Sequence, residues 1–240
     1  MALLSVRPLL GAASDVVLAV DEAPNPWFDP SYVSDNWDTI LGHLREHVWL
    51  TVAAVALGAL IALPSALLAR RSRWLAGPVL GLSTVVYTIP SLAMFAFILP
   101  VTGLSATTVL VGLTAYSLVI LVRNFLAGLR GVPDDVREAA RGMGLGSLQL
   151  FLKVDLPLAL PAFMAGLRVA TVSTVALVTV GVLVGHGGLG QLITGGFAAN
   201  EYRAEIVTGA LGCVLLALVA DLLLAGLERV LTPWARAGRS

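Results

Sequence analysis

The chain has 240 residues, of which 58% are hydrophobic and 12% charged, and its mean hydropathy is +0.89. Because soluble domains carry roughly 45–50% apolar and about 25% charged residues, this composition excludes a water-soluble globule and indicates a membrane protein. The 15 basic and 15 acidic residues cancel, so no overall field points to a nucleic-acid partner. The single cysteine, Cys213, cannot form a disulfide within the chain.

The first 47 residues are predicted to form an external segment. Residues 1–20 are apolar, but Arg7, Pro8 and Asp15 interrupt them, and each central charge costs about 2.5–3.5 kcal/mol in a membrane helix. We therefore expect an interfacial or irregular external segment, with a weak signal, an anchor or an extra span as the alternatives. Residues 21–38 are acidic and rich in proline, which predicts a loop.

Five apolar runs are long enough to cross a bilayer as helices, which takes about 20 residues each. We expect an all-α polytopic bundle, with a transmembrane domain over residues 48–230 and a cytoplasmic tail over residues 231–240. The runs cover residues 48–69, 75–99, 104–122, 158–184 and 206–227.

The charges between these runs predict the orientation of the bundle. The segments on one side carry eleven basic and five acidic residues, and those on the other side carry three basic and nine acidic residues. Because short cytoplasmic loops are enriched in Lys and Arg, the basic side is predicted to be cytoplasmic, with the N-terminus outside and the C-terminus inside.

Two ionisable residues interrupt the last two apolar runs. Arg168 and Asp221 are predicted to lie about 15 Å and 10 Å from the cytoplasmic ends of their helices. Such groups are costly in a membrane and usually face the interior of a bundle. We expect an ion pair between the fourth and fifth spans, with snorkelling to the nearer surface as the alternative.

The longest segment on the basic side, residues 124–157, is predicted to contain two short helices. Pro133 and Asp134 are typical of a helix N-terminus, and three glycines end that helix. Ser147 is a candidate cap for a second short helix over residues 149–154. The three glycines are Gly142, Gly144 and Gly146.

The first of these helices carries a motif that resembles the EAA loop of the membrane subunits of ABC importers. The family pattern is EAA-x3-G-x9-I-x-LP, and this chain departs from it only by a valine in place of isoleucine. The two alanines have almost no side chain, so a partner surface can approach them closely, while Arg141 supplies charge beside them. The motif consists of Glu138, Ala139, Ala140, Gly144, Val154, Leu156 and Pro157.

The resemblance extends over residues 36–197 and is closest to the permeases for glycine betaine, carnitine and choline. It rests on YTIPSL at residues 87–92, PAFMAGLRVAT at 161–171 and GHGGLG at 185–190. Tyr87 stands where the family has glutamine, and His186 where it has alanine. With the two intramembrane charges, the candidate pathway or gating residues are Tyr87, Pro90, Ser91, Arg168, Asp221, Gly187, Gly188 and Gly190.

The resemblance implies a permease subunit of an ATP-driven importer in a bacterial inner membrane, with a type I importer fold. The chain has no GxxxxGK[ST] loop, so ATP and Mg are expected on a separate ATPase, and no catalytic residue, metal or cofactor is expected here. The family also implies an extracytoplasmic substrate-binding protein and a second copy of this chain or a similar permease. The expected substrate is a quaternary ammonium osmoprotectant, with methionine or phosphonate as alternatives.

A quaternary ammonium has no proton to donate, so its recognition normally relies on aromatic faces. Tyr87, Phe95 and Phe97 are candidates for such contacts along the second span. Packing against lipid or within the core is the alternative interpretation of these rings.

Two literal motifs suggest other chemistry. The GHGGLG run satisfies GxGxxG, but no acidic residue follows at the spacing of about 20 that a dinucleotide site requires, so we expect a flexible external turn or gate. His43, Glu46 and His47 fit HxxEH, a zinc-hydrolase pattern, in which the two histidines hold a metal and Glu46 is the general base. A membrane metallohydrolase is thus the alternative from another functional class, although no third ligand is recognisable.

Overall fold

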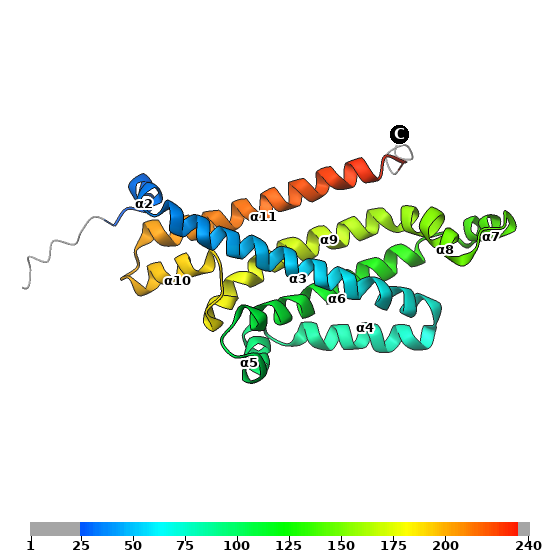
Figure 1. Cartoon of the computed structure of the whole chain (residues 1–240), viewed down its shortest axis with the longest axis horizontal. Helices are drawn as coiled ribbons and strands as arrows, with labels where there is room; N and C mark the ends of the chain where they lie inside the picture. Colours follow the sequence, from blue (N-terminus) through cyan, green and yellow to red (C-terminus); the bar gives the residue numbers. More distant parts are fainter. Residues whose placement is uncertain (1–24, 235–240) are drawn as a thin grey trace, which may run out of the picture.

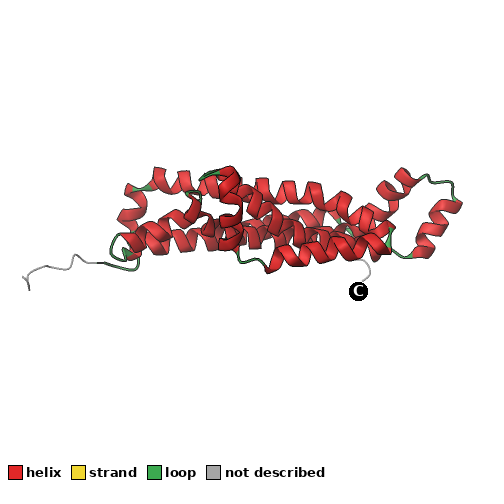
Figure 2. Ribbon diagram, turned by 90° about the horizontal axis from the view of Figure 1, so that it is seen from below, coloured by secondary structure: helices red, strands yellow, loops and turns green. Residues whose placement is uncertain are grey.

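The computed structural model describes residues 25–234, so the predictions for residues 1–20 and for the tail beyond residue 234 lie outside the described part. All regular structure within this part is helical, and the long helices run along one axis (Figures 1 and 2). The elements are α2 Pro30–Asp35, α3 Trp37–Arg71, α4 Arg73–Thr88, α5 Ser91–Thr102, α6 Ala106–Arg130, α7 Asp134–Gly142, α8 Ser147–Leu150, the π-helical turn η1 Phe151–Asp155, α9 Leu156–Val178, the 3-10 turn η2 Thr179–Val184, α10 Gly190–Ala198 and α11 Arg203–Leu231.

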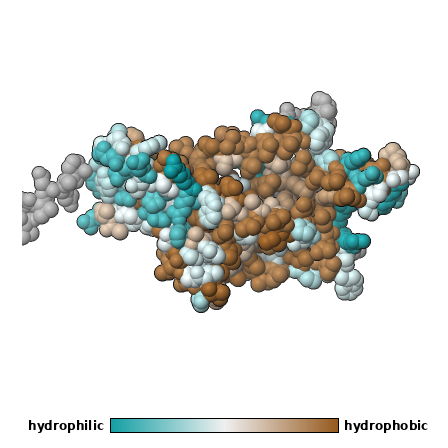
Figure 3. Space-filling view, viewed as in Figure 1, coloured by the Kyte–Doolittle hydropathy of each residue, from teal (hydrophilic) through white to brown (hydrophobic). Residues whose placement is uncertain are grey.

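Four of the described helices are long and apolar enough to cross a membrane, and the pair α4 and α5 together supplies a fifth apolar segment. These five segments alternate in direction along the bundle, so that α2 and α10 lie at one end and α7 at the other (Figure 1). Side chains in the middle of the visible face are mainly hydrophobic, and hydrophilic ones gather toward its ends (Figure 3). The predicted all-α polytopic bundle is confirmed.

The second predicted span is not one continuous helix. Its two halves, α4 and α5, meet at an angle of 98° around Ile89 and Pro90. A proline has no N–H to donate and pushes the preceding residue out of the helical region, and Ile89 accordingly adopts φ −69° and ψ 123°. Hydropathy predicted the apolar length of this segment correctly, but not its change of direction.

The N-terminal end of the described part is more helical than predicted. Pro30–Asp35 forms α2, where Asp29 accepts a hydrogen bond from the Ser31 N–H at 2.9 Å and Pro30 occupies the first turn. The next helix, α3, begins at Trp37, well before the predicted start at residue 48, and its 35 residues span about 50 Å. The loop predicted for residues 21–38 is therefore wrong from residue 30 onward.

The core forms around α6, which packs against α3 and α9. The rings of Phe125 and Phe163 are stacked with centroids 4.3 Å apart, and Leu121, Leu129 and Ala62 are fully buried beside them. By contrast, none of the residues in the most apolar stretch of α11 is buried. The described fold thus leaves α11 turned toward lipid or another chain.

Candidate functional site

The helix α7 carries the first part of the EAA motif at one end of the bundle. Asp134 and Asp135 occupy its first turn, where acidic side chains favour the positive end of a helix. Glu138 and Ala139 are exposed on it, whereas Ala140 is only 2% exposed. The two alanines therefore differ in role, because Ala139 is open to a partner and Ala140 packs α7 against the rest of the chain.

A tight turn follows α7 and exposes apolar side chains. Gly144 has φ +84°, a left-handed conformation that glycine adopts without steric cost, and the Leu145 N–H donates to the Ala140 carbonyl at 3.2 Å. Around this turn, Met143 is 74% and Leu148 69% exposed. Together with Arg141, which is exposed on the last turn of α7, these side chains form a surface that a partner protein could cover.

The second half of the motif is part of a long helix. Residues 147–155 form α8 and η1, which continue into α9, so the separate helix predicted for residues 149–154 is wrong. Ser147 is the first residue of α8 and not its cap, because Gly146 occupies that position. Val154 and Leu156 pack against the core, and Pro157 is the second residue of α9, directly after the π-helical turn η1.

An ion-pair network that the sequence did not suggest fixes α7 to the bundle. Asp155 is 4% exposed and accepts from Arg70 at 2.8 and 3.1 Å and from the Arg137 Nε at 2.9 Å. Arg137 also bonds the exposed Asp134 at 2.8 Å. One carboxylate thereby links the last turn of α3, the middle of α7 and the end of η1, directly before α9.

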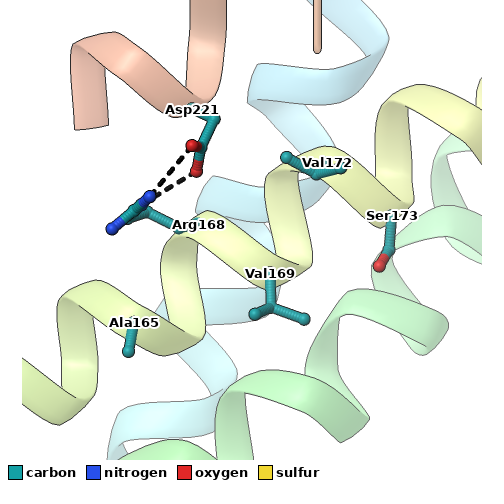
Figure 4. A pocket seen from close by; sticks show the side chains of 6 residues that line it. All are labelled: Ala165, Arg168, Val169, Val172, Ser173 and Asp221. Atoms are coloured by element: carbon teal, nitrogen blue, oxygen red, sulfur yellow. Dashed lines mark hydrogen bonds and ion pairs between the residues drawn. The ribbon is translucent and has the colours of Figure 1, made fainter. Parts of the chain in front are cut away.

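The predicted ion pair between the last two spans is present. The Arg168 guanidinium donates to both oxygens of Asp221, at 2.8 and 2.9 Å (Figure 4). It also donates to Glu228 at 3.3 Å. Side chains of α9 and Asp221 of α11 line an open pocket of about 350 Å³ beside this pair. Both side chains of the pair remain about one third exposed in the single chain, so the pair lies at the edge of the bundle and not in its centre.

The bend between α4 and α5 gathers the residues of the YTIPSL run. The Tyr116 hydroxyl donates to the carbonyl of Ile89, the residue at which α4 ends. The Tyr87 ring contacts the Tyr116 ring edge-on, with centroids 6.3 Å apart, but is itself 55% exposed. Ser91 begins α5 directly after the bend. Phe95, by contrast, is 1% exposed and belongs to the core.

Most of the GHGGLG segment is closely packed, although Gly185 is exposed at its start. Gly187, Gly188 and Gly190 are all buried. Any Cβ at Gly188 would lie 2.6 Å from the Cβ and 2.8 Å from the Cα of His47, and Gly188 itself has φ +51°. The three glycines lie at the opposite end of the bundle from α7, so the candidate pathway residues and the EAA helix do not form one cluster.

Gly188→Ala is expected to destabilise the protein strongly, because a methyl group there must displace the backbone of α3 and adopt a strained φ. We expect a loss of about 2 kcal/mol or more, measured as a lower melting temperature of the purified chain. Gly42→Ala is the matched control in α3, since nothing lies within 4 Å of that position. Equal melting temperatures for the two variants would contradict the packing described here.

The metallohydrolase interpretation of His43, Glu46 and His47 is wrong. His47 is fully buried, and its two ring nitrogens bond the Val175 carbonyl at 3.0 Å and the Leu189 N–H at 3.3 Å. Glu46 contacts the His186 Nδ1 at 2.8 Å, so it faces the glycine turn. In residues 25–234 no group of three or more His, Cys, Asp or Glu side chains is arranged to hold a metal ion.

Comparison with known proteins finds relatives that are membrane components of transport systems. Residues 36–237 match the family model described as the binding-protein-dependent transport system inner membrane component. The chain is 38% identical over 203 residues to the glycine betaine/carnitine/choline transport system permease protein OpuCD of Bacillus subtilis, which covers 85% of this chain and 89% of that protein. It is 39% identical over 207 residues to the osmoprotectant import permease protein OsmW of Salmonella typhimurium, with 84% and 96% covered.

Solved structures share the same fold. A chain from inward-facing conformations of the MetNI methionine ABC transporter superposes with a TM-score of 0.74 at 23% identity, over 80% of this chain and 96% of that one. A crystal structure of an amino acid ABC transporter with histidines superposes with a TM-score of 0.66 at 20% identity. These likenesses establish the importer permease architecture of the bundle.

Proposed function

The chain belongs to the family of binding-protein-dependent transport system inner membrane components, and we propose from this premise that it forms the membrane pathway of an importer for quaternary ammonium osmoprotectants. It is a multi-pass inner-membrane protein and a transport subunit. The substrate proposal is carried by its identity of 34–39% with permeases whose names specify glycine betaine, carnitine, choline or osmoprotectants.

We propose that a separate ATPase binds the surface formed by Glu138, Ala139, Arg141, Met143 and Leu148. These side chains are exposed around α7 and the following turn, and the apolar ones among them favour protein contact over water. The Asp155 network would transmit a movement of α7 to α3 and α9, because it bonds all three. ATP and Mg would then be bound by that partner and not by this chain.

The remaining partners follow from the shape of the chain and its charges. A second copy or a similar permease would enclose the pathway, and the apolar face of α11, which is unburied in the single chain, leaves a surface for it. The basic end with α7 is proposed to lie in the cytoplasm, with the N-terminus outside. A substrate-binding protein would dock at the opposite end, near α2 and α10.

ATP-dependent uptake tests the proposed function directly. The chain is purified from its native membrane with the subunits that co-purify, and is reconstituted in liposomes with ATP inside and the binding protein outside. We expect saturable uptake of at least one of radiolabelled glycine betaine, carnitine and choline, and none of methionine. Uptake of methionine without any of the other three would overturn the substrate proposal while keeping the permease assignment.

A further inference from the structure

An open groove between α4 and α6 contains an arginine without an acidic partner. The groove measures about 340 Å³ and is lined by Leu80, Arg123, Leu126, Ala127 and Arg130. Arg123 is exposed, and its Nη2 donates to the Thr84 hydroxyl at 2.7 Å. Most of the donors of this guanidinium are therefore available to a ligand in the groove.

The lack of a carboxylate partner distinguishes Arg123 from the three arginines whose ion pairs join neighbouring helices of the bundle. Arg70, Arg137 and Arg168 each bond one or two acidic side chains. Within residues 25–234, no carboxylate oxygen is recorded within 4.0 Å of an Arg123 nitrogen. An arginine in a membrane-spanning helix needs water, an anion or a protein partner, so this face of the bundle cannot be turned toward lipid.

The direction of the side chain excludes simple snorkelling to the nearer surface. Arg123 lies about 10 Å along α6 from Arg130, where the helix ends. Its partner Thr84 lies about 16 Å along α4 from Arg73, and α4 begins at the end of the bundle where α6 ends. The guanidinium is thus held at a hydroxyl that is deeper in the bundle than the arginine itself.

An exposed aromatic ring lies on the same face of α4 as Thr84, the hydroxyl partner of this arginine. Tyr87 follows Thr84 by three residues, which places the two side chains on one side of the helix about one turn apart. Gly77, Gly81 and Thr88 are also exposed along α4. An aromatic face attracts a quaternary ammonium, and a guanidinium binds a carboxylate through two parallel hydrogen bonds.

We propose that Arg123 and Tyr87 form a transit site that selects zwitterionic betaines, with Arg123 binding the carboxylate and Tyr87 the quaternary ammonium. This inference rests on the proposed function and deepens it, because it names the substrate class within the quaternary ammonium compounds. Choline has the same cationic group but no carboxylate, so it leaves the guanidinium unpaired in the groove. The site therefore favours glycine betaine and carnitine over choline.

The test compares the uptake of glycine betaine and choline by reconstituted complexes with Arg123→Gln. We expect glycine betaine uptake to fall about tenfold or more, because a charge-assisted pair is lost, while choline uptake changes less than about twofold. Arg71→Gln, at the exposed end of α3, is the matched control for loss of one basic charge and should preserve both activities. Tyr87→Leu should lower the uptake of both substrates, and Tyr87→Phe should preserve it.

Each remaining outcome separates this inference from the proposed function. An equal fall for both substrates, or wild-type uptake of choline without glycine betaine, would overturn the inference and leave the permease assignment intact. No wild-type uptake of any quaternary ammonium compound would overturn the proposed function itself. Co-purification of the subunits and basal ATPase activity are measured in parallel, and loss of assembly in Arg123→Gln would assign the arginine to a subunit interface and contradict the transit site.

Discussion

Ala139→Glu is expected to abolish most of the binding-protein-stimulated ATPase activity and uptake, while leaving the chain folded in the membrane. Ala139 is exposed on α7, so a larger side chain fits the isolated chain but keeps the proposed ATPase surface at a distance. Loss of close contact at the centre of an interface costs about 2 kcal/mol or more, which corresponds to about thirtyfold weaker binding of the ATPase. The measurement is the amount of ATPase that co-purifies, together with ATPase activity in the presence of binding protein.

The neighbouring alanine provides the control that separates docking from folding. Ala140 is 2% exposed, so Ala140→Glu would bury a carboxylate against the bundle and should lower the melting temperature and the yield of the chain. Ala139→Ser, which adds one small group, should retain most activity. If Ala139→Glu keeps full stimulated ATPase activity, α7 is not the coupling contact.

The short helix α7 could be predicted from sequence because its determinants are local. These determinants lie within about ten residues of one another. They are Pro133 at the N-cap, two aspartates in the first turn and Gly144 in the left-handed turn. The five apolar segments were predictable for a similar reason, since a bilayer imposes a length that hydropathy measures directly. The ion pair between Arg168 and Asp221 followed from the cost of two unpaired charges at similar depth.

Other features depend on direction and packing, which composition does not record. Hydropathy averaged over residues 75–99 is the same for a straight and a bent segment, although Ile89 followed by Pro90 was a local signal for the break. Asp29 before Pro30 was likewise a signal for α2 that the acidic, proline-rich character of the segment obscured. The burial of Gly188 against His47 needed the tertiary structure, because 141 residues separate the two positions.

The Asp155 network was missed because its members were treated as loop charges. Arg70, Arg137 and Asp155 come from three elements, and no sequence spacing connects them. One signal was present, since Asp155 lies between Val154 and Leu156 of the motif, where an acidic side chain next to an apolar helix needs a partner. The buried carboxylate at this position anchors α7 to the bundle through Arg137.

Asp155→Asn is expected to uncouple the permease by releasing α7 from α3 and α9. The substitution preserves the size of the side chain but removes the charge that holds two guanidinium groups together in a mostly buried site. Breaking a buried pair by removing one partner costs about 3 kcal/mol or more, because the remaining charges stay uncompensated. We expect a lower melting temperature and a loss of uptake that exceeds the loss of basal ATPase activity.

Asp134→Asn is the matched control, because it removes a carboxylate that bonds the same Arg137 at 2.8 Å but is 90% exposed. An exposed pair contributes only about 0–1 kcal/mol, so this variant should retain wild-type stability and uptake. Accelerated proteolysis or hydrogen exchange in residues 133–146 of Asp155→Asn, and not of Asp134→Asn, would show that α7 has become loose. Equal behaviour of the two variants would contradict the role of the network, since burial is the property that distinguishes the two carboxylates.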